Sequence, residues 1–196
     1  MSGERRRDIC LDSKPLVHES VAGESAVDRL KVFCVGGTID KVYFDAISAY
    51  QVGEPQVVAI FEGANVCFSY EIVPLMRKDS LEMTDDDRAS LRDAVAQDPS
   101  DKILITHGTD TMVLTAEALA DIPGKTIVLT GAMAPARFRD SDATFNIGFA
   151  VGALAALQSG TYVAMNGKVF PAGHVRKNRE AGRFEATRPS GEKVDR

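Results

Sequence analysis

The sequence predicts an α/β fold, a single-domain three-layer sandwich with a parallel sheet at its centre. Short runs of β-branched residues alternate with helical stretches along the chain, and such alternation is typical of parallel strands joined by right-handed crossovers. Most of the runs are apolar throughout, as expected of strands that are covered on both faces. With 196 residues, the chain is closer to one typical domain of about 150 residues than to two.

Five runs are expected to form the strands of this sheet, because they are rich in Val, Ile, Leu and Thr. They cover residues 30–35, 66–75, 102–106, 125–130 and 161–165. Only the run at 66–75 mixes polar and apolar side chains. The other four are therefore the strands expected to have helices on both faces.

The clearest helix signal begins at Thr84, whose side chain suits the N-cap position. Three aspartates follow it in the first turn, where the helix dipole favours negative charge. Leu91 and Val95 share one face, and Asp98-Pro99 ends the pattern. We therefore expect a helix between the second and third strands.

Two further helices are expected over 111–120 and 141–158, and a short one over 55–62. The inner face of the 141–158 helix is expected to carry the side chains of Phe145, Phe149, Gly152 and Ala156. Strands and helices in this order predict a flavodoxin-like sheet. Its ligands bind in the crevice at the carboxyl ends of the strands.

The ends of the chain differ in composition from the part between them. Residues 1–28 mix charged residues with Ser, Gly and Pro and lack periodicity, so we expect a flexible N-terminal extension. Residues 29–185 are the expected folded domain, and 186–196 a flexible tail. No run approaches the ~18 apolar residues of a membrane span, and no signal-peptide pattern is present. We expect a cytoplasmic protein without a membrane partner.

Charge and metal-ligand patterns narrow the possible partners. The net charge of −5 argues against a nucleic-acid partner and favours a small molecule. The three cysteines form no CxxC pair, and the three histidines are widely spaced. Neither pattern matches a metal site, so no metal and no cofactor are expected.

Two loops at neighbouring strand ends place a glycine before a threonine. Residues 36–38 (Gly-Gly-Thr) follow the first expected strand, and residues 108–110 (Gly-Thr-Asp) follow the third. Glycine lets the backbone come close to a ligand. A hydroxyl nucleophile needs an activating base and donors for the developing oxyanion, and paired loops of this kind supply hydroxyls and backbone N–H groups together.

On the residues alone, other interpretations stay open. A tight turn or a helix cap explains each loop, and a cap needs only one of Thr109 and Asp110. Lys177 lies in a polar stretch in which a solvated lysine is the usual finding. His107 suits either a general base or a structural hydrogen-bonding role.

The two loops resemble the signature loops of the bacterial-type L-asparaginases, which use a threonine nucleophile. The resemblance rests on residues 36–39 (Gly-Gly-Thr-Ile) and 106–112 (Thr-His-Gly-Thr-Asp-Thr-Met). Further matches follow in the expected order at 79–85, 130–133, 145–146, 164–166 and around Lys177, so that residues 30–184 are covered. The length is similar to that of the short, single-domain members, which consist of the N-terminal domain.

The resemblance implies that the chain hydrolyses L-asparagine to L-aspartate and ammonia through an acyl-enzyme intermediate. Thr38 is the implied nucleophile, activated by Tyr43 in a mobile lid over 41–44, a stretch that lacks a helix or strand pattern. The implied second catalytic group is Thr109, Asp110 and Lys177. The implied substrate-binding residues are Gly37, Asp79, Ser80, Gly108 and Ala132.

Two alternatives remain beside this activity. One is a related amidohydrolase, either a glutaminase or the amide-cleaving subunit of an amidotransferase; the other is a noncatalytic module that binds a small ligand. Leu81 stands where longer members often have a glutamine beside the serine, and it offers no hydrogen bond to a substrate. We therefore expect a homo-oligomer, a dimer or tetramer, that closes the site through the polar segment 171–185 with Arg183 and Glu185.

Overall fold

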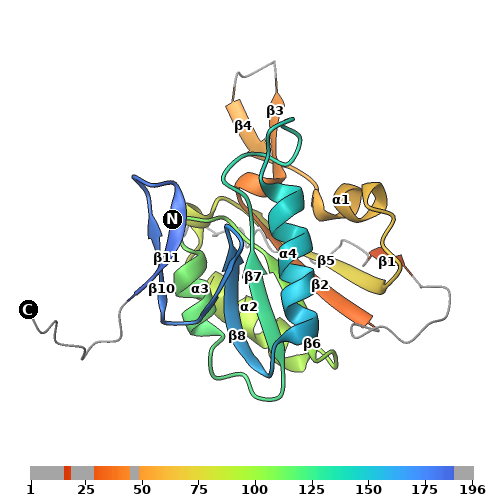
Figure 1. Ribbon diagram of the computed structural model, residues 1–196, viewed down its shortest axis with the longest axis vertical. Coiled ribbons are helices and arrows are strands. Elements are labelled where there is room, and N and C mark those ends of the chain that lie inside the picture. Colours follow the sequence, from red (N-terminus) through yellow and green to blue (C-terminus); the bar gives the residue numbers. More distant parts are fainter. Residues whose placement is uncertain (1–15, 19–28, 45–48, 188–196) are drawn as a thin grey trace, which may run out of the picture.

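The computed structural model describes residues 16–18, 29–44 and 49–187, and its centre is a seven-stranded sheet (Figure 1). Its strands are β1 (Leu16–His18), β2 (Arg29–Gly36), β5 (Ser69–Lys78), β6 (Lys102–Thr106), β7 (Thr126–Thr130), β8 (Gly160–Met165) and β9 (Lys168–Pro171). In space they follow the order β1-β5-β2-β6-β7-β8-β9. The five inner strands are parallel, and the two edge strands pair antiparallel. The predicted parallel α/β sheet is confirmed.

In the described part of the chain, α-helices cover both faces of this sheet (Figure 1). They are α1 (Val57–Gly63), α2 (Asp85–Gln97), α3 (Met112–Ala118) and α4 (Ala143–Ala156). The apolar side chains of α2 and α3 pack on one face, and those of α1 and α4 pack on the other. All four helices expected from the sequence are present.

The three-layer arrangement explains why the central strands are apolar throughout. Ile103 and Ile105 of β6 belong to the core beneath α2 and α3, whereas Leu104 belongs to the core beneath α1 and α4. None of the three has exposed surface. Because successive side chains of a strand point to opposite faces, a strand with helices on both sides needs an apolar residue at every position.

The predicted start of α2 is confirmed in detail. The hydroxyl of Thr84 accepts a hydrogen bond from the backbone N–H of Asp87 at 3.2 Å, and the Asp87 carboxylate accepts one from the Thr84 N–H at 2.8 Å. This capping box satisfies two groups that a helix start otherwise leaves unpaired. Leu91 and Val95 are fully buried, as predicted.

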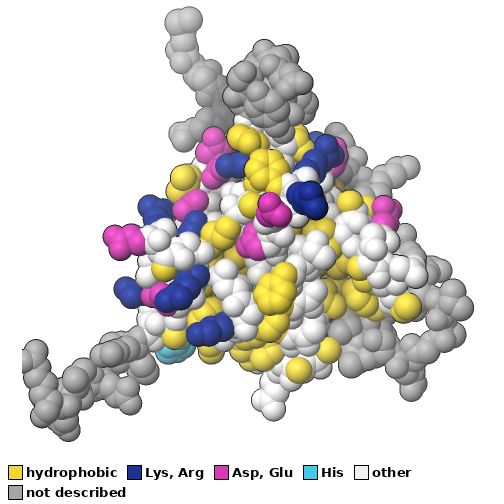
Figure 2. All heavy atoms as spheres, turned by 45° about the horizontal axis from the view of Figure 1, so that its top comes forward, with side chains coloured by type: hydrophobic (Ala, Val, Ile, Leu, Met, Phe, Trp, Pro, Cys, Tyr) yellow, Lys and Arg dark blue, Asp and Glu magenta, His cyan; other side chains and the backbone are white. Residues whose placement is uncertain are grey.

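The predicted inner face of α4 is wrong. Phe145 is 60% exposed and Phe149 stacks against it, while the face on the sheet carries Asn146, Ile147, Ala150 and Leu154. Figure 2 shows apolar side chains at the surface over this helix. The helix contains no charged residue, so its sequence does not indicate which of its sides faces the sheet. The buried amide of Asn146 decides the rotation, because it donates to the Gly131 carbonyl at 3.0 Å.

Two hairpins project from the sheet where the sequence predicts irregular segments (Figure 1). One pairs β3 (Lys41–Phe44) with β4 (Ala49–Val52), and the other pairs β10 (Val175–Asn178) with β11 (Arg183–Ala186). The expectation that 41–44 lacks strand structure is therefore wrong. Short hairpin strands of this kind are stabilised by their pairing rather than by an apolar pattern, which is why the sequence does not reveal them.

The expected terminal segments lie mostly outside the described residues. Within the expected extension 1–28, only Leu16–His18 are described, and they pair antiparallel with β5 as β1. Of the expected tail 186–196, only residues 186 and 187 are described. In the part of the chain that is described, no helix is both long enough and apolar enough to cross a membrane.

Candidate active site

The strand order creates a crevice between β2 and β6. After β2 the chain crosses to β5 on one side, and from there it returns to β6 on the other side. Ligands of doubly wound sheets bind at such a reversal, beyond the carboxyl ends of the strands. Thr38 lies two residues after the end of β2, and Thr109 lies three residues after the end of β6. The structure therefore brings the two loops singled out in the sequence to one crevice.

Glycine lets these loops come into direct backbone contact. A Cβ atom added to Gly37 would lie 2.2 Å from the Cα of Gly108, and one added to Gly108 would lie 2.6 Å from the hydroxyl of Ser80. Gly37 also has a φ of +98°, a conformation that favours glycine. Three predicted site residues from three loops are thus packed together, and no side chain fits between them.

Lys177 reaches the second loop from the β10–β11 hairpin. Its Nζ donates hydrogen bonds to Thr109 Oγ1 at 2.7 Å and to Asp110 Oδ1 at 3.0 Å. Arg179 of the same hairpin contacts the same Asp110 oxygen at 3.3 Å. Thr109 is buried, and 15% of the Lys177 side chain is exposed. The three residues that the resemblance groups together therefore form one hydrogen-bonded cluster.

The hairpin that carries Lys177 is anchored at its base. Val175 and Phe184 lie in the core beneath α2 and α3. The side-chain oxygen of Asn166 accepts a hydrogen bond from the Phe184 N–H at 3.0 Å, and the Asn166 N–H donates to Asn146 Oδ1 at 3.2 Å. This chain of amides connects the hairpin to α4, so the position of Lys177 is fixed by the core. Charged side chains of both signs gather around the hairpin on the left of Figure 2.

Asp79 and Ser80 complete the crevice on the β5 side. Asp79 accepts a hydrogen bond from the Leu81 N–H at 3.1 Å and pairs with the Lys41 ammonium at 2.6 Å. Partial burial raises the pKa of Asp79, but the hydrogen bonds from Lys41 and Leu81 outweigh it and leave the pKa below its ordinary value. The Ser80 carbonyl accepts from the Thr111 hydroxyl at 2.7 Å. Hydrogen bonds therefore connect this loop to β3 and to the start of α3.

The loop after β7 places Ala132 in a buried position beside the crevice. A Cβ atom on Gly131 would lie 2.2 Å from the His107 carbonyl oxygen, so this loop also packs tightly against the β6 loop. The carboxylate of Asp142 accepts hydrogen bonds from the N–H groups of Met133 and Ala134, at 2.9 and 3.2 Å. Those two donors are consequently engaged and are not free to bind a substrate oxygen.

The structure favours the structural role of His107. Its Nδ1 donates to the Gly108 carbonyl at 2.7 Å, and its Nε2 accepts from the Thr115 hydroxyl at 2.8 Å. Burial lowers the pKa of His107 to about 4, so the ring is neutral at pH 7. Among the described residues, no group of three or more His, Cys, Asp or Glu side chains is arranged to hold a metal ion.

Asp40 is a buried acidic residue that the sequence does not single out, and it ends the 3-10 helix that begins at Thr38. Its carboxylate is 2% exposed and accepts a hydrogen bond from the Gln56 N–H at 2.8 Å, and its carbonyl accepts from the Gly53 N–H at 2.8 Å. These bonds hold the exit of the β3–β4 hairpin against the Thr38 turn. The only signal in the sequence is an acidic residue directly after the Gly-Gly-Thr-Ile run.

Asp40→Asn is expected to remove a pH dependence of stability. Burial raises the pKa of Asp40 to about 7 from 3.8; the Gln56 N–H and Arg77 act against this rise, and Glu54 adds to it. Between these values the folded state holds a proton that the unfolded state has lost, so wild-type stability falls as the pH rises. From pH 5 to pH 8, the free energy of unfolding of the wild type is expected to fall by about 2–3 kcal/mol more than that of the variant.

Urea unfolding of both proteins at the two pH values measures this difference. Asparagine keeps an acceptor oxygen for the Gln56 N–H, so the comparison isolates the ionisation. An equal change of unfolding free energy in both proteins would contradict the assignment.

Comparison with known proteins identifies relatives of this arrangement. The family described as Asparaginase, N-terminal matches residues 29–190. An L-asparaginase of Thermococcus kodakarensis is 32% identical over 164 residues, 79% of this chain and 49% of that protein. A probable periplasmic L-asparaginase of Haemophilus influenzae is 32% identical over 170 residues, covering 81% and 48%. One component of the glutamyl-tRNA(Gln) amidotransferase of Thermoplasma acidophilum is 29% identical over 122 residues, covering 60% and 29%.

Solved structures of L-asparaginases are also similar to this chain. The thermostable L-asparaginase from Thermococcus kodakarensis superposes with a TM-score of 0.71 at 28% identity, over 81% of this chain and 51% of that one. A probable cytoplasmic L-asparaginase from Campylobacter jejuni gives 0.65 at 28% identity, over 81% and 53%. This chain thus spans about half the length of the L-asparaginases that it matches.

Proposed function

Because this chain belongs to the asparaginase family, we propose that it hydrolyses L-asparagine to L-aspartate and ammonia. The observation that carries the proposal is the contact of Lys177 with Thr109 and Asp110, on a loop packed against the one that bears Thr38. Ammonia release from L-asparagine by the purified chain tests it. A protein that binds L-aspartate but releases no ammonia would instead indicate a noncatalytic ligand-binding module.

In the proposed reaction, the hydroxyl of Thr38 attacks the side-chain amide carbon of asparagine. The C–N bond breaks, the hydroxyl proton passes to the leaving nitrogen, and an aspartyl ester of Thr38 remains. Water then attacks the ester, a proton returns to the threonine oxygen, and aspartate leaves. Backbone N–H groups of the Thr38 and Thr109 loops, with that of Ala132, are the proposed donors to the oxyanion.

The remaining site residues are proposed to activate and hold the reactants. Tyr43, on β3, is proposed to polarise Thr38; its side chain lies outside the described part of the structure. Lys177 is proposed to carry protons through its hydrogen bond with Thr109. Asp110 is proposed to hold Lys177 and contact the substrate ammonium, while Asp79 and Ser80 are proposed to position its α-carboxylate.

A second candidate within the family is amide hydrolysis in an amidotransferase or a glutaminase. The similarity to the amidotransferase component of Thermoplasma acidophilum supports it. One methylene distinguishes glutamine from asparagine and is worth about 1–3 kcal/mol in a pocket. Comparison of kcat/KM for L-asparagine and L-glutamine decides between them, because the second candidate requires the higher value for glutamine.

Arg179→Gln is expected to lower KM for L-asparagine about two- to fivefold with little change in kcat. Arg179 and Lys177 contact the same oxygen of Asp110, so removal of the guanidinium leaves more negative charge for the substrate ammonium. The effect is modest because 69% of the Arg179 side chain is exposed, and exposed ion pairs contribute about 0.2–1 kcal/mol.

Arg176→Gln is the matched control for this effect. Arg176 has the same charge on the same hairpin and is 66% exposed, but it pairs with Glu185 rather than Asp110. Steady-state kinetics of both variants measure KM. A KM that is unchanged or raised in Arg179→Gln, or lowered equally in the control, would disprove the effect.

We also propose that the active protein is a homo-oligomer, a dimer or tetramer. Leu81 is 66% exposed beside the proposed substrate-binding residue Ser80 and offers no hydrogen bond to a substrate, so a second protomer is proposed to close the crevice. Glu185 is already paired with Arg176 and Arg183 of its own hairpin. Sedimentation at the concentration of the activity assay is expected to give a species heavier than 21.1 kDa. Full activity of a monomer would contradict this.

A further inference from the structure

The charged groups of the crevice are unequal in number. Among the described site residues, the carboxylates are those of Asp79 and Asp110, and each is already paired with a lysine. Lys41 Nζ lies 2.6 Å from Asp79 Oδ2, and Lys177 Nζ lies 3.0 Å from Asp110 Oδ1. Arg179 adds a third cation, 3.3 Å from the same Asp110 oxygen. Three cations therefore face two carboxylates, and this group of side chains carries a net positive charge.

The positive charge of Lys177 acts on both carboxylates. Burial raises the pKa of Asp79, but the hydrogen bonds from Lys41 and the Leu81 N–H lower it, and the charges of Lys41 and Lys177 lower it further. Lys177 thus favours the ionised form of Asp79 in addition to its direct contact with Asp110. An ammonium group placed between these carboxylates would meet cations at both of them.

The hairpin side of the crevice is positive as well. A hollow of about 440 Å³ opens on the β10–β11 hairpin, and three of its five lining residues are cations while one is an acid. The lining consists of Arg176, Lys177, Asn178, Arg179 and Glu180. A surface with this excess of positive charge attracts a carboxylate and repels an ammonium group.

The acids next to the crevice loops are engaged within the protein. The Asp142 carboxylate accepts hydrogen bonds from the N–H groups of Met133 and Ala134. The Asp40 carboxylate is buried and accepts one from the Gln56 N–H at 2.8 Å. Neither carboxylate can turn to a ligand without breaking these bonds. The α-ammonium of an amino acid therefore has to compete at Asp110 with cations that the fold itself supplies.

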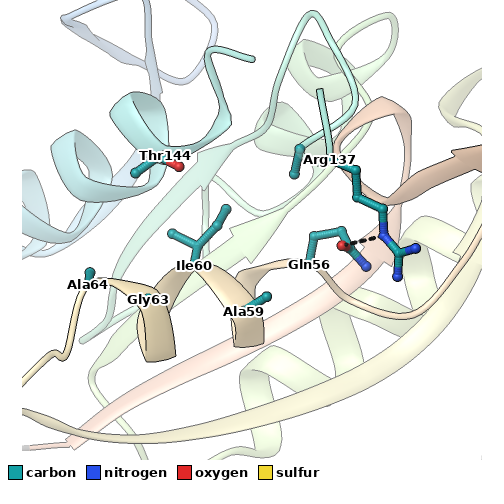
Figure 3. Close-up of a pocket in the computed structure, with 8 residues that line it drawn as sticks. Gln56, Ala59, Ile60, Gly63, Ala64, Arg137 and Thr144 are labelled. Carbon is teal, nitrogen blue, oxygen red and sulfur yellow. Dashed lines mark hydrogen bonds between the residues drawn. The ribbon is translucent and has the colours of Figure 1, made fainter. Parts of the chain in front are cut away.

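A second hollow, of about 470 Å³, lies between α1 and the segment that leads into α4 (Figure 3). The one charged residue of its lining is Arg137, whose Nε donates to Gln56 Oε1 at 3.1 Å. Figure 3 shows the terminal nitrogens of Arg137 beyond Gln56, turned away from the apolar side chains of α1. This hollow offers no charged group to a small ligand, so recognition of a charged substrate falls to the crevice.

We propose that the crevice selects side-chain amides of four-carbon dicarboxylic acids that carry no ammonium group beside the carboxylate. Such a substrate keeps the carboxylate, which the positive charge attracts, and the amide carbon, which Thr38 attacks. It lacks the cation that would compete with Lys177 and Arg179 for Asp110. Malamate, in which a hydroxyl replaces the ammonium of asparagine, and succinamate, which has neither group, belong to this class.

This inference rests on the proposed amide hydrolysis and concerns only the preferred substrate. The chemistry is unchanged: the C–N bond of the amide breaks, an ester of Thr38 forms, and water releases the acid. Malamate and water give malate and ammonia, and succinamate and water give succinate and ammonia. Arg179 is the residue that sets the preference, because it adds the unbalanced charge at Asp110.

Ammonia release from L-malamate and L-asparagine by the purified chain at pH 7 tests the proposal. The two molecules have nearly the same shape and differ in the charge of one group, and kcat/KM is expected to be at least tenfold higher for L-malamate. Succinamate is expected to exceed L-asparagine as well, and the higher value of the two analogues identifies the preferred member of the class. An equal or higher kcat/KM for L-asparagine than for L-malamate would overturn the proposal.

The pH dependence of this preference provides a second readout. The α-ammonium of L-asparagine loses its proton above about pH 8, whereas the hydroxyl of L-malamate does not ionise there. Ionisations of the protein affect both substrates and cancel in the ratio of their kcat/KM values. The preference is therefore expected to shrink at least threefold between pH 7 and pH 9.5. A constant ratio would contradict the role assigned to charge.

Two variants assign the preference to one side chain. Arg179→Gln is expected to narrow the ratio at pH 7 about two- to fivefold, because it removes the unbalanced charge. Arg176→Gln is the matched control and is expected to leave the ratio unchanged, since Arg176 pairs with Glu185. Equal narrowing in both variants would disprove the role of Arg179. If none of the three amides releases ammonia, the proposed hydrolysis itself is wrong; if L-asparagine is preferred, only this inference is wrong.

Discussion

Thr38→Ala is expected to abolish ammonia release from L-asparagine while the protein remains folded. Thr38 is only partly buried at the start of a short 3-10 helix, and its hydroxyl has no hydrogen-bond partner among the described residues. Its truncation therefore costs the fold little. The proposed reaction has no other nucleophile, so kcat is expected to fall by about three orders of magnitude or more.

The controls for this variant separate chemistry from folding. Thr38→Ser keeps a hydroxyl and is expected to retain measurable turnover. Circular dichroism and urea unfolding are expected to be the same for wild type and Thr38→Ala within experimental error. If Thr38→Ala retained a tenth or more of the wild-type kcat, Thr38 would not be the nucleophile.

Lys177→Met is expected to lower kcat by about two to four orders of magnitude, the usual contribution of a group that transfers protons. Methionine retains an unbranched apolar stem, but the hydrogen bond to Thr109 at 2.7 Å and the ion pair with Asp110 at 3.0 Å are lost. The pH dependence of kcat is expected to change with them, because the proposed proton carrier is absent.

Lys168→Met is the matched control, since Lys168 is exposed on β9 and has no ion pair in the described part of the chain. It is expected to leave kcat unchanged. Steady-state rates from pH 5 to pH 9 measure both variants. A wild-type pH–rate profile for Lys177→Met would remove Lys177 from the proposed mechanism.

The parallel part of the fold was predictable because burial on both faces leaves a simple signature. Strand β7, for example, is buried at every position, and its sequence contains only Thr, Ile, Val and Leu. The rotation of α4 about its axis was not predictable, because the helix itself carries apolar residues on every side. Phe145 and Ile147 are both apolar, yet one is exposed and the other buried. The choice depends on Asn146, whose partners Gly131 and Asn166 come from other parts of the chain.

The candidate site was predictable only in part, for a related reason. Gly37 and Gly108 follow strands of recognisable type, so the sequence indicates that both lie at the same edge of the sheet. The contact of Arg179 with Asp110 depends on the β10–β11 hairpin, whose first strand contains one apolar residue, Val175. The buried carboxylate of Asp40 accepts a hydrogen bond from the Gln56 N–H, which lies beyond the intervening β3–β4 hairpin in the sequence. A single sequence does not record such long-range pairings.

If the proposed mechanism holds, the position of Lys177 beyond the last strand of the central sheet determines when the protein can begin hydrolysis during its synthesis. The ribosome makes β2 first of the inner strands, and it makes Val175–Asn178 after every strand of that sheet. A nascent chain can therefore pair its strands while Thr109 and Asp110 still lack their ammonium partner. In the proposed mechanism, hydrolysis begins only after Lys177 has left the exit tunnel, so translation products that stop before β10 consume no substrate.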